Sequence, residues 1–151
     1  MRQFISLLFL TLLTVSAAVA QSADASAYHG AEATKARYRA VYQLNTADTS
    51  VISHALANIQ NALNDPRLKG KLDMELVVYG GANIVYRKDK PQFEKQLQDL
   101  QKQGVILAMC ENTMRMRKIK REELFPFISY VPTANGELII RQTDGWAIVR
   151  P

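Results

Sequence analysis

The sequence has 151 residues, of which 48% are hydrophobic, and a formal charge of +5. This length accommodates a single domain with a sizeable core, and the composition is that of an ordinary globular protein. The positive excess is too small to indicate nucleic acid as a partner.

The amino terminus has the three regions of a secretory signal peptide in their usual order. Arg2 supplies a positive charge, residues 4–15 form an apolar run, and small residues from Ala18 to Ala20 offer a cleavage site. We therefore predict that residues 1–20 are a signal peptide and that the protein is periplasmic. An uncleaved anchor is the alternative. After cleavage no stretch is long and apolar enough to span a membrane.

Residues 21–36 are rich in Ala and Ser without clear periodicity, which indicates a flexible leader before a domain over 37–151. Alternating side chains over 37–44 predict a first strand. Apolar side chains at helical spacing over 52–63 then predict a helix, and the Asn-Asp-Pro sequence at 64–66 ends it.

An apolar segment over 72–79 predicts a second strand buried on both faces, as in a parallel sheet. The strand ends in Gly80 and Gly81, which indicate a tight turn. Pro91 is suited to the first turn of another helix, and Gly104 is well placed to terminate it.

The unbroken apolar run over 105–109 predicts a third strand, and we expect it to be the central one. Cys110 follows it, and a helix is expected to continue through the basic segment 115–121. Residues 130–133 predict a short strand, and Pro132 argues against a central position for it.

A short helix over 138–142 and a last strand over 146–149 complete the domain. Alternation of strands and helices is typical of an α/β fold. We predict a mostly parallel five-stranded sheet covered by helices on both faces, wound by right-handed crossovers.

Cys110 is the only cysteine, so the chain cannot form an internal disulfide. At the start of a helix, unpaired N–H groups and the helix dipole stabilise a thiolate and lower the pKa of the thiol. Such a thiolate attacks sulfane sulfur, disulfides and peroxides. The alternative is a small, buried and inert side chain that closes the strand.

Three features follow predicted strands and therefore fall on the carboxyl edge of the sheet, where α/β folds bind ligands. They are Gly80-Gly81, Cys110 and the loop containing Pro132. Asn58, on a polar stripe of the first helix, is a further pocket candidate, or it simply binds water. The basic segment 115–121 either attracts small anions to the thiol or is a solvated helix face.

Other site classes have no support in the sequence. The two histidines have no Cys or carboxylate at ligand spacing, so we expect no metal site. Glycine-rich nucleotide motifs and the G-x-S-x-G elbow are missing from the sequence, so we expect no nucleotide cofactor and no serine hydrolase chemistry.

Several segments together resemble the DsrE/DsrF-like family, and the similarity extends from about Arg37 to Pro151. The most specific are the Cys-x-Asn-Thr stretch from Cys110 to Thr113 and the closing Gln-x-x-Gly-Trp-Ala from Gln142. The remaining similar segments are 54–61, 75–80, 104–109 and 131–132.

The resemblance implies a three-layer α/β/α domain that assembles as homo-oligomers, as trimers or hexamers, and a link to sulfur metabolism. By similarity to sulfur-relay relatives, Cys110 would carry a persulfide and exchange sulfur with a small sulfur anion or a partner thiol protein. Asn112 and Thr113 would then bind the sulfur anion, in a pocket shared with Gly80, Gly81 and Asn58.

Three functions remain open from the sequence. The leading hypothesis is a periplasmic sulfur-binding or sulfur-transfer protein with Cys110 as persulfide carrier. The second is a non-catalytic binding or assembly protein in which Cys110 is incidental. The third is a thiol-based peroxide sensor that dimerises through Cys110.

Overall fold

The computed structural model describes residues 27–151, so the predicted signal peptide and the first part of the predicted leader lie outside the described residues. The chain divides into two units, and the second, Glu32–Pro151, contains all the helices and strands named below. In the described part of the chain, none of the helices combines the length and apolar character needed to cross a membrane.

The sheet is parallel at every strand pairing and has the order β4-β3-β2-β1-β5. Its strands are β1 (Tyr38–Leu44), β2 (Leu72–Val78), β3 (Ile106–Cys110), β4 (Ser129–Val131) and β5 (Ala147–Val149). The predicted fold class is confirmed. The expectation that β3 is central was wrong, because β2 takes that position. An unbroken apolar run indicates that both faces of a strand are buried. This holds for β2 as well, so the pattern could not distinguish the central strand from its neighbour.

Four α-helices and three short 3-10 helices connect the strands. The α-helices are α1 (Thr49–Asn64), α2 (Glu94–Lys102), α3 (Glu111–Arg117) and α4 (Ala134–Thr143). The 3-10 helices are η2 (Gly80–Tyr86), η3 (Pro91–Phe93) and η4 (Arg121–Glu123).

Two helices differ from their predicted extents. The helix after Cys110 stops at Arg117, because Lys118 adopts a left-handed conformation with φ of 56° and breaks the helical turn before the basic segment is complete. The helix expected over 138–142 already begins at Ala134, because the Thr133 side chain accepts a hydrogen bond from Gly136 N and caps an earlier start.

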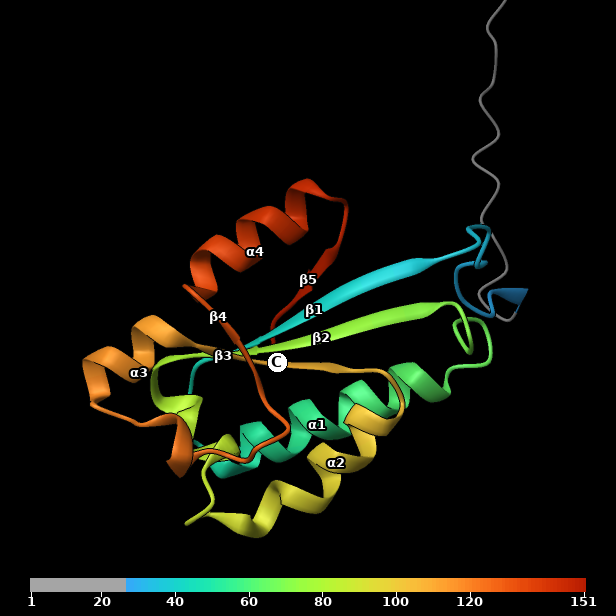
Figure 1. The fold of residues 1–151 in the computed structure, drawn as a ribbon. Helices are drawn as coiled ribbons and strands as arrows, with labels where there is room; N and C mark the ends of the chain where they lie inside the picture. The colour runs from blue at the N-terminus through green and yellow to red at the C-terminus, as the bar shows by residue number, and fades with distance from the viewer. Residues whose placement is uncertain (1–26) are drawn as a thin grey trace, which may run out of the picture. The chain divides into compact units, whose positions relative to one another are not determined.

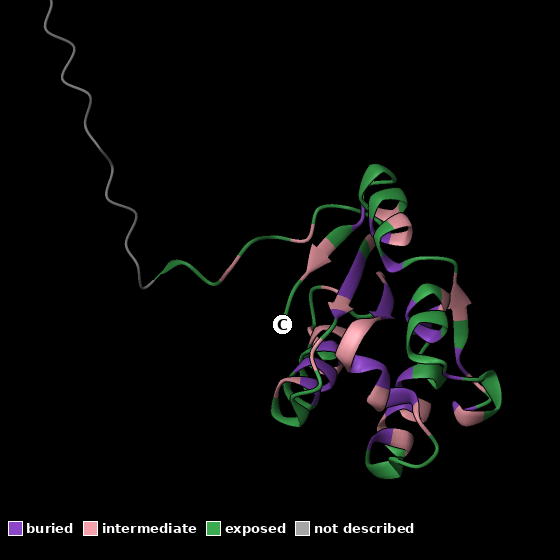
Figure 2. Ribbon diagram, turned by 90° about the vertical axis from the view of Figure 1, so that its left-hand side faces the viewer, coloured by how far each residue is buried: buried purple, intermediate pink, exposed green. Residues whose placement is uncertain are grey.

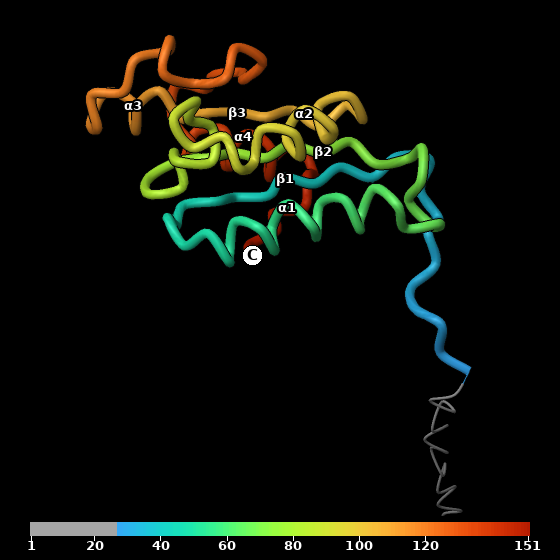
Figure 3. Tube along the Cα trace, turned by 90° about the horizontal axis from the view of Figure 1, so that it is seen from below, coloured from blue at the N-terminus to red at the C-terminus, as the bar shows by residue number. Residues whose placement is uncertain are grey.

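Helices cover the two faces of the sheet unequally (Figure 1): α1 and α2 lie on one side and α4 on the other. Seen from the side of α1 and α2, α1 extends along the sheet beside β1 (Figure 3). Right-handed crossovers explain the division, because the chain moves outward from β1 to β4 and then returns across the sheet to β5. The return connection carries α4 and places it on the opposite face.

The buried side chains form two separate clusters, one on each face. Figure 2 marks the buried residues along the ribbon in purple. The larger cluster lies under α1 and α2 and includes Leu56 and Leu97, both fully buried. The smaller cluster lies under α4 and contains seven buried residues, Cys110 and Trp146 among them. The only cysteine of the chain is therefore on the less thickly covered face.

Candidate functional site

The site lies where the connections after two neighbouring strands leave the sheet in opposite directions. After β3 the chain enters α3, whose Met114 packs in the larger core, and after β4 it enters α4, whose Leu138 packs in the smaller core. Such a reversal opens a crevice beyond the carboxyl ends of the strands, which is the usual ligand site of open α/β sheets.

A cavity of about 330 Å³ occupies this crevice. The residues that line it come from the ends of β2 and β3 and from the first turns of α3 and α4: Tyr79, Cys110, Asn112, Thr113, Thr133, Ala134 and Asn135. The cavity therefore contains three of the predicted site residues, namely Cys110, Asn112 and Thr113.

Cys110 is the last residue of β3 and the N-cap of α3, and only 3% of its surface is exposed. Its Sγ accepts a hydrogen bond of 3.3 Å from Ala134 N, the first amide of α4. The sulfur therefore lies at the amino ends of two helices, where unpaired N–H groups and helix dipoles favour negative charge.

Opposing effects act on the Cys110 thiol. Burial raises the pKa of Cys110, but hydrogen bonds from the backbone and hydroxyl of Thr113 and from the amides of Ala134 and Asn112 outweigh it. The pKa of the thiol is therefore below its ordinary value. The structure thus favours the thiolate, which is the reactive form of cysteine, at the wall of a small cavity.

Thr113 links the sulfur to the loop after β2. Its Oγ1 accepts a hydrogen bond of 3.0 Å from Gly80 N, and its hydroxyl proton is then available to the Cys110 sulfur. Thr113 is itself buried. Gly80, from the predicted turn after the second strand, and Thr113 and Cys110, from the Cys-x-Asn-Thr stretch, thus form one chain of contacts.

Gly80 and Gly81 shape this loop and do not line the cavity. Gly80 has φ of +55°, and a Cβ on Gly81 would lie 3.0 Å from Ala47 N. The two glycines therefore allow the backbone to pass close to the loop after β1. Their contribution to the site is to place the Gly80 amide on Thr113.

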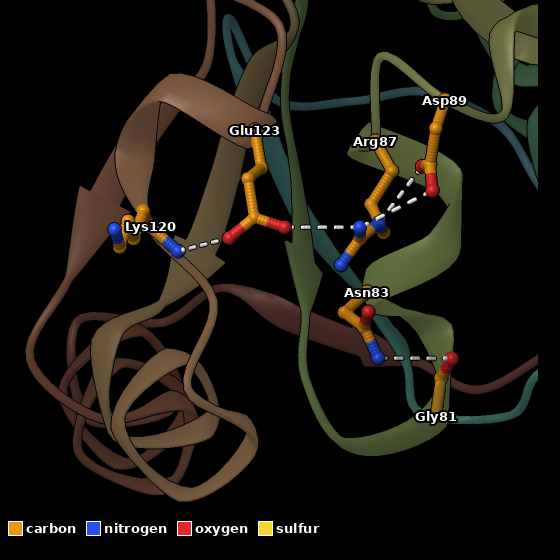
Figure 4. Close-up of polar contacts among 6 residues, drawn as sticks. All are labelled: Gly81, Asn83, Arg87, Asp89, Lys120 and Glu123. Carbon is orange, nitrogen blue, oxygen red and sulfur yellow. Dashed lines mark hydrogen bonds and ion pairs between the residues drawn. The ribbon is translucent and has the colours of Figure 1, made fainter.

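The segment that follows Gly81 is tied to the loop after α3 (Figure 4). Arg87 forms ion pairs with Asp89 at 2.8 Å and with Glu123 at 3.0 Å. Glu123 also accepts a hydrogen bond from Lys120 N, and Asn83 donates to the Gly81 carbonyl. The two loops beside the site therefore hold each other in place.

Asn58 is not brought to the cavity. It lies in the third turn of α1, exposed, on the face of the sheet opposite to α4. The structure therefore places Asn58 apart from the other five predicted site residues. No described contact joins it to the cavity around Cys110.

The basic segment 115–121 borders a second, more open hollow of about 530 Å³. Arg121 in this segment pairs with Glu111 and stacks over the ring of Tyr130 at 4.2 Å. Arg115 donates to the side chain of Asn112, which lines the Cys110 cavity. One cation of the segment thus reaches the cavity through Asn112, while Arg117 and Lys118 are exposed.

Sequence reasoning missed the contribution of the loop after β4 in detail. Thr133, Ala134 and Asn135 line the cavity, whereas the sequence pattern singles out only Pro132 in this loop. Thr133 is a residue type that favours the N-cap, and that preference is the available signal, although the predicted strand 130–133 includes this residue. Among residues 27–151 no three His, Cys, Asp or Glu side chains are grouped so that they could hold a metal ion.

Comparisons with known proteins agree on one family and one fold. The model of the DsrE/DsrF-like family matches residues 23–151. A solved protein of unknown function from Methanobacterium thermoautotrophicum is 30% identical, with a TM-score of 0.71 over 76% of this chain and 99% of its own.

Two further solved structures share the fold at lower identity. One is a conserved protein of unknown function from Bacteroides thetaiotaomicron, 10% identical, with a TM-score of 0.60 over 75% of this chain and 94% of its own. The other is the ychN protein from E. coli, 16% identical, with a TM-score of 0.59 over 76% and 99%. Among curated proteins none matches the chain.

Proposed function

The chain belongs to the DsrE/DsrF-like family, and on this premise we propose that it is a sulfur-transfer protein that carries sulfane sulfur as a persulfide on Cys110. One observation carries the proposal: Cys110 Sγ faces a cavity and accepts the hydrogen bond from Ala134 N at the start of α4. The same contacts that lower the pKa of the thiol also suit a persulfide, which is an anion at neutral pH.

A donor such as thiosulfate can load Cys110 with sulfur without a further oxidant. The Cys110 thiolate attacks the outer sulfur, the S–S bond of thiosulfate breaks, and sulfite leaves with the electron pair. The added sulfur then extends into the cavity, near the first amides of α3 and α4. A thiolate of a partner protein would remove it by the same type of attack.

Asn112 and Thr113 are proposed as the groups that bind the sulfur anion. Both line the cavity in the first turn of α3, and the Thr113 hydroxyl is oriented by Gly80 N. The lack of a second cysteine suits a carrier, since no internal thiol can resolve the persulfide.

The intact mass of the mature protein after exposure to thiosulfate or polysulfide tests the proposal. We expect a gain of whole sulfur atoms that a reductant reverses and that the Cys110→Ser variant does not show. If thiol titration shows that Cys110 is free in the folded protein and neither donor adds mass, persulfide carriage with these donors is excluded.

A second candidate function is non-catalytic binding in the same cavity, with Cys110 incidental. The observation that favours it is the low exposure of Cys110, 3% of its surface. Alkylation of the native protein separates the two: a thiol that reacts only after unfolding supports the binding protein, and one that reacts in the native state supports the carrier.

We further propose that the protein is exported to the periplasm and assembles as a homo-oligomer, a trimer or hexamer. Exposed large apolar side chains on β3 and α4, Ile106, Ile139 and Ile140, support assembly. Cell fractionation with amino-terminal sequencing tests export, for which we expect a mature chain that begins at Gln21. Light scattering of the purified protein tests assembly, and a monomeric mass would contradict it.

A further inference from the structure

A charged cluster is buried between the central strand and α4, away from the cavity. The side chain of Glu75, on β2, is only 1% exposed, and its Oε2 lies 2.6 Å from Arg141 Nε on α4. The same Nε lies 2.8 Å from Glu137 Oε1, one helical turn earlier. The Arg141 guanidinium also stacks over the Trp146 ring at 4.2 Å.

A contribution to folding stability does not explain the Glu75–Arg141 ion pair. Burial raises the pKa of Glu75 to about 7, and this effect exceeds the attraction of Arg141. Glu137 competes for the same guanidinium, and in residues 27–151 no well-aligned hydrogen bond reaches either Glu75 oxygen. A buried ion pair of this kind commonly contributes less than an apolar pair of equal volume.

Glu75 and the sulfur of Cys110 lie on the same face of the sheet. Val77 pairs with Ala108, and both belong to the smaller core together with Cys110. Alternate residues of a strand share a face, so Glu75 is on the face of Val77. This face is the one that α4 covers.

The helix α4 therefore has polar contacts to the sheet at both ends. At its amino end Ala134 N donates to Cys110 Sγ, and seven residues later Arg141 pairs with Glu75. Seven residues of helix span about 10 Å. Between the two contacts, Leu138 supplies apolar packing, which depends less on the exact position of the helix than a short ion pair does.

We propose that the Glu75–Arg141 ion pair is a positioning device that fixes α4 on the sheet so that Ala134 N stays on the Cys110 sulfur. The two residues act through the helix and do not touch the sulfur. This inference rests on the proposed function only for its purpose, because the placement of an amide on a thiolate is measurable whether or not sulfur is transferred.

The rate of Cys110 alkylation as a function of pH tests the device. In Glu75→Gln and Arg141→Gln the midpoint of the profile should rise by about half to one pH unit, as expected for a weakened charge-assisted hydrogen bond. Arg141→Lys keeps the positive charge, so its midpoint should lie closer to that of the unchanged protein than the midpoint of Arg141→Gln does.

A double-variant cycle separates positioning from general loss of structure. If both residues act through one ion pair, the Glu75→Gln/Arg141→Gln protein should shift the midpoint no further than either single variant. Shifts that add would show two independent effects and overturn the proposal. An unchanged midpoint in folded single variants would overturn it as well.

Arg37→Gln is the matched control. Arg37 pairs with Asp73, which lies on β2 like Glu75, but this ion pair is at the surface. It should leave the alkylation profile unchanged. Protection of the Ala134 amide from hydrogen exchange provides a second measurement in any variant with reduced stability, and it should fall in Glu75→Gln but not in Arg37→Gln. Equal protection in both would contradict the proposal. Failure of persulfide loading with an intact midpoint shift would reject only the proposed function.

Discussion

The two faces of the sheet are built differently. The face under α1 and α2 packs apolar side chains in one large cluster and contains no buried ion pair among the described residues. The face under α4 is thinner and holds the buried Glu75–Arg141 pair and the Cys110 sulfur. The comparison indicates that one face supplies most of the stability and the other tolerates the polar groups that a site requires.

The largest expected effect on stability comes from shortening a buried side chain in the larger core. Leu56→Ala removes a fully buried side chain of α1 and should lower the free energy of unfolding by about 2–5 kcal/mol. The pH profile of Cys110 alkylation should not move, because α1 lies across the sheet from the sulfur. Denaturant unfolding and alkylation of the same sample measure both. A shifted profile would show that the two faces are not independent.

The next effect is a pH dependence that belongs to the α4 face. The folded protein holds Glu75 with a pKa of about 7, whereas the ordinary value is 4.5. Between these values the folded state keeps a proton that the unfolded chain loses. The free energy of unfolding should therefore fall by about 2–3 kcal/mol as the pH rises from 4.5 through 7.

Glu75→Gln should remove this slope, since glutamine does not titrate. Unfolding measured between pH 4 and pH 8 checks it, with Arg37→Gln as the variant expected to keep the slope. An identical slope in Glu75→Gln would assign the titration to another group.

Thr113→Val isolates the contact between the sulfur and the loop after β2. It leaves Gly80 N without its acceptor and should cost about 1–3 kcal/mol of stability. Because the hydroxyl also lowers the pKa of Cys110, the alkylation midpoint should rise. Thr113→Ser keeps the hydroxyl and is the control. A valine variant with an unshifted midpoint would show that the hydroxyl does not act on the sulfur.

The smallest effect is expected at the surface. Arg37 and Asp73 are 63% and 38% exposed, so Arg37→Gln should change the free energy of unfolding by less than about 1 kcal/mol. Thermal unfolding at low and high salt checks it. A larger loss would mean that this surface pair does more than its exposure indicates.

Much of the candidate site could be predicted locally. Cys110, Asn112 and Thr113 are consecutive or nearly so, and they follow an apolar strand that the sequence marks clearly. Asn58 does not line the described cavity, and its polar stripe on a helix could not reveal which face of the sheet that helix covers. Glu75 was not singled out, because a lone carboxylate inside a strand has no local pattern that reveals a distant arginine.

By itself the sequence determined the alternation of strands and helices, the parallel sheet and the thiol at the end of β3. These depend on hydrophobic periodicity and turn residues, which act over a few residues. Only the tertiary structure decided the strand order, with β2 in the centre and β5 beside β1, and the arrival of α4 at Cys110. The physical reason is that these contacts join segments far apart in the chain, and they are selected by the packing of the whole domain.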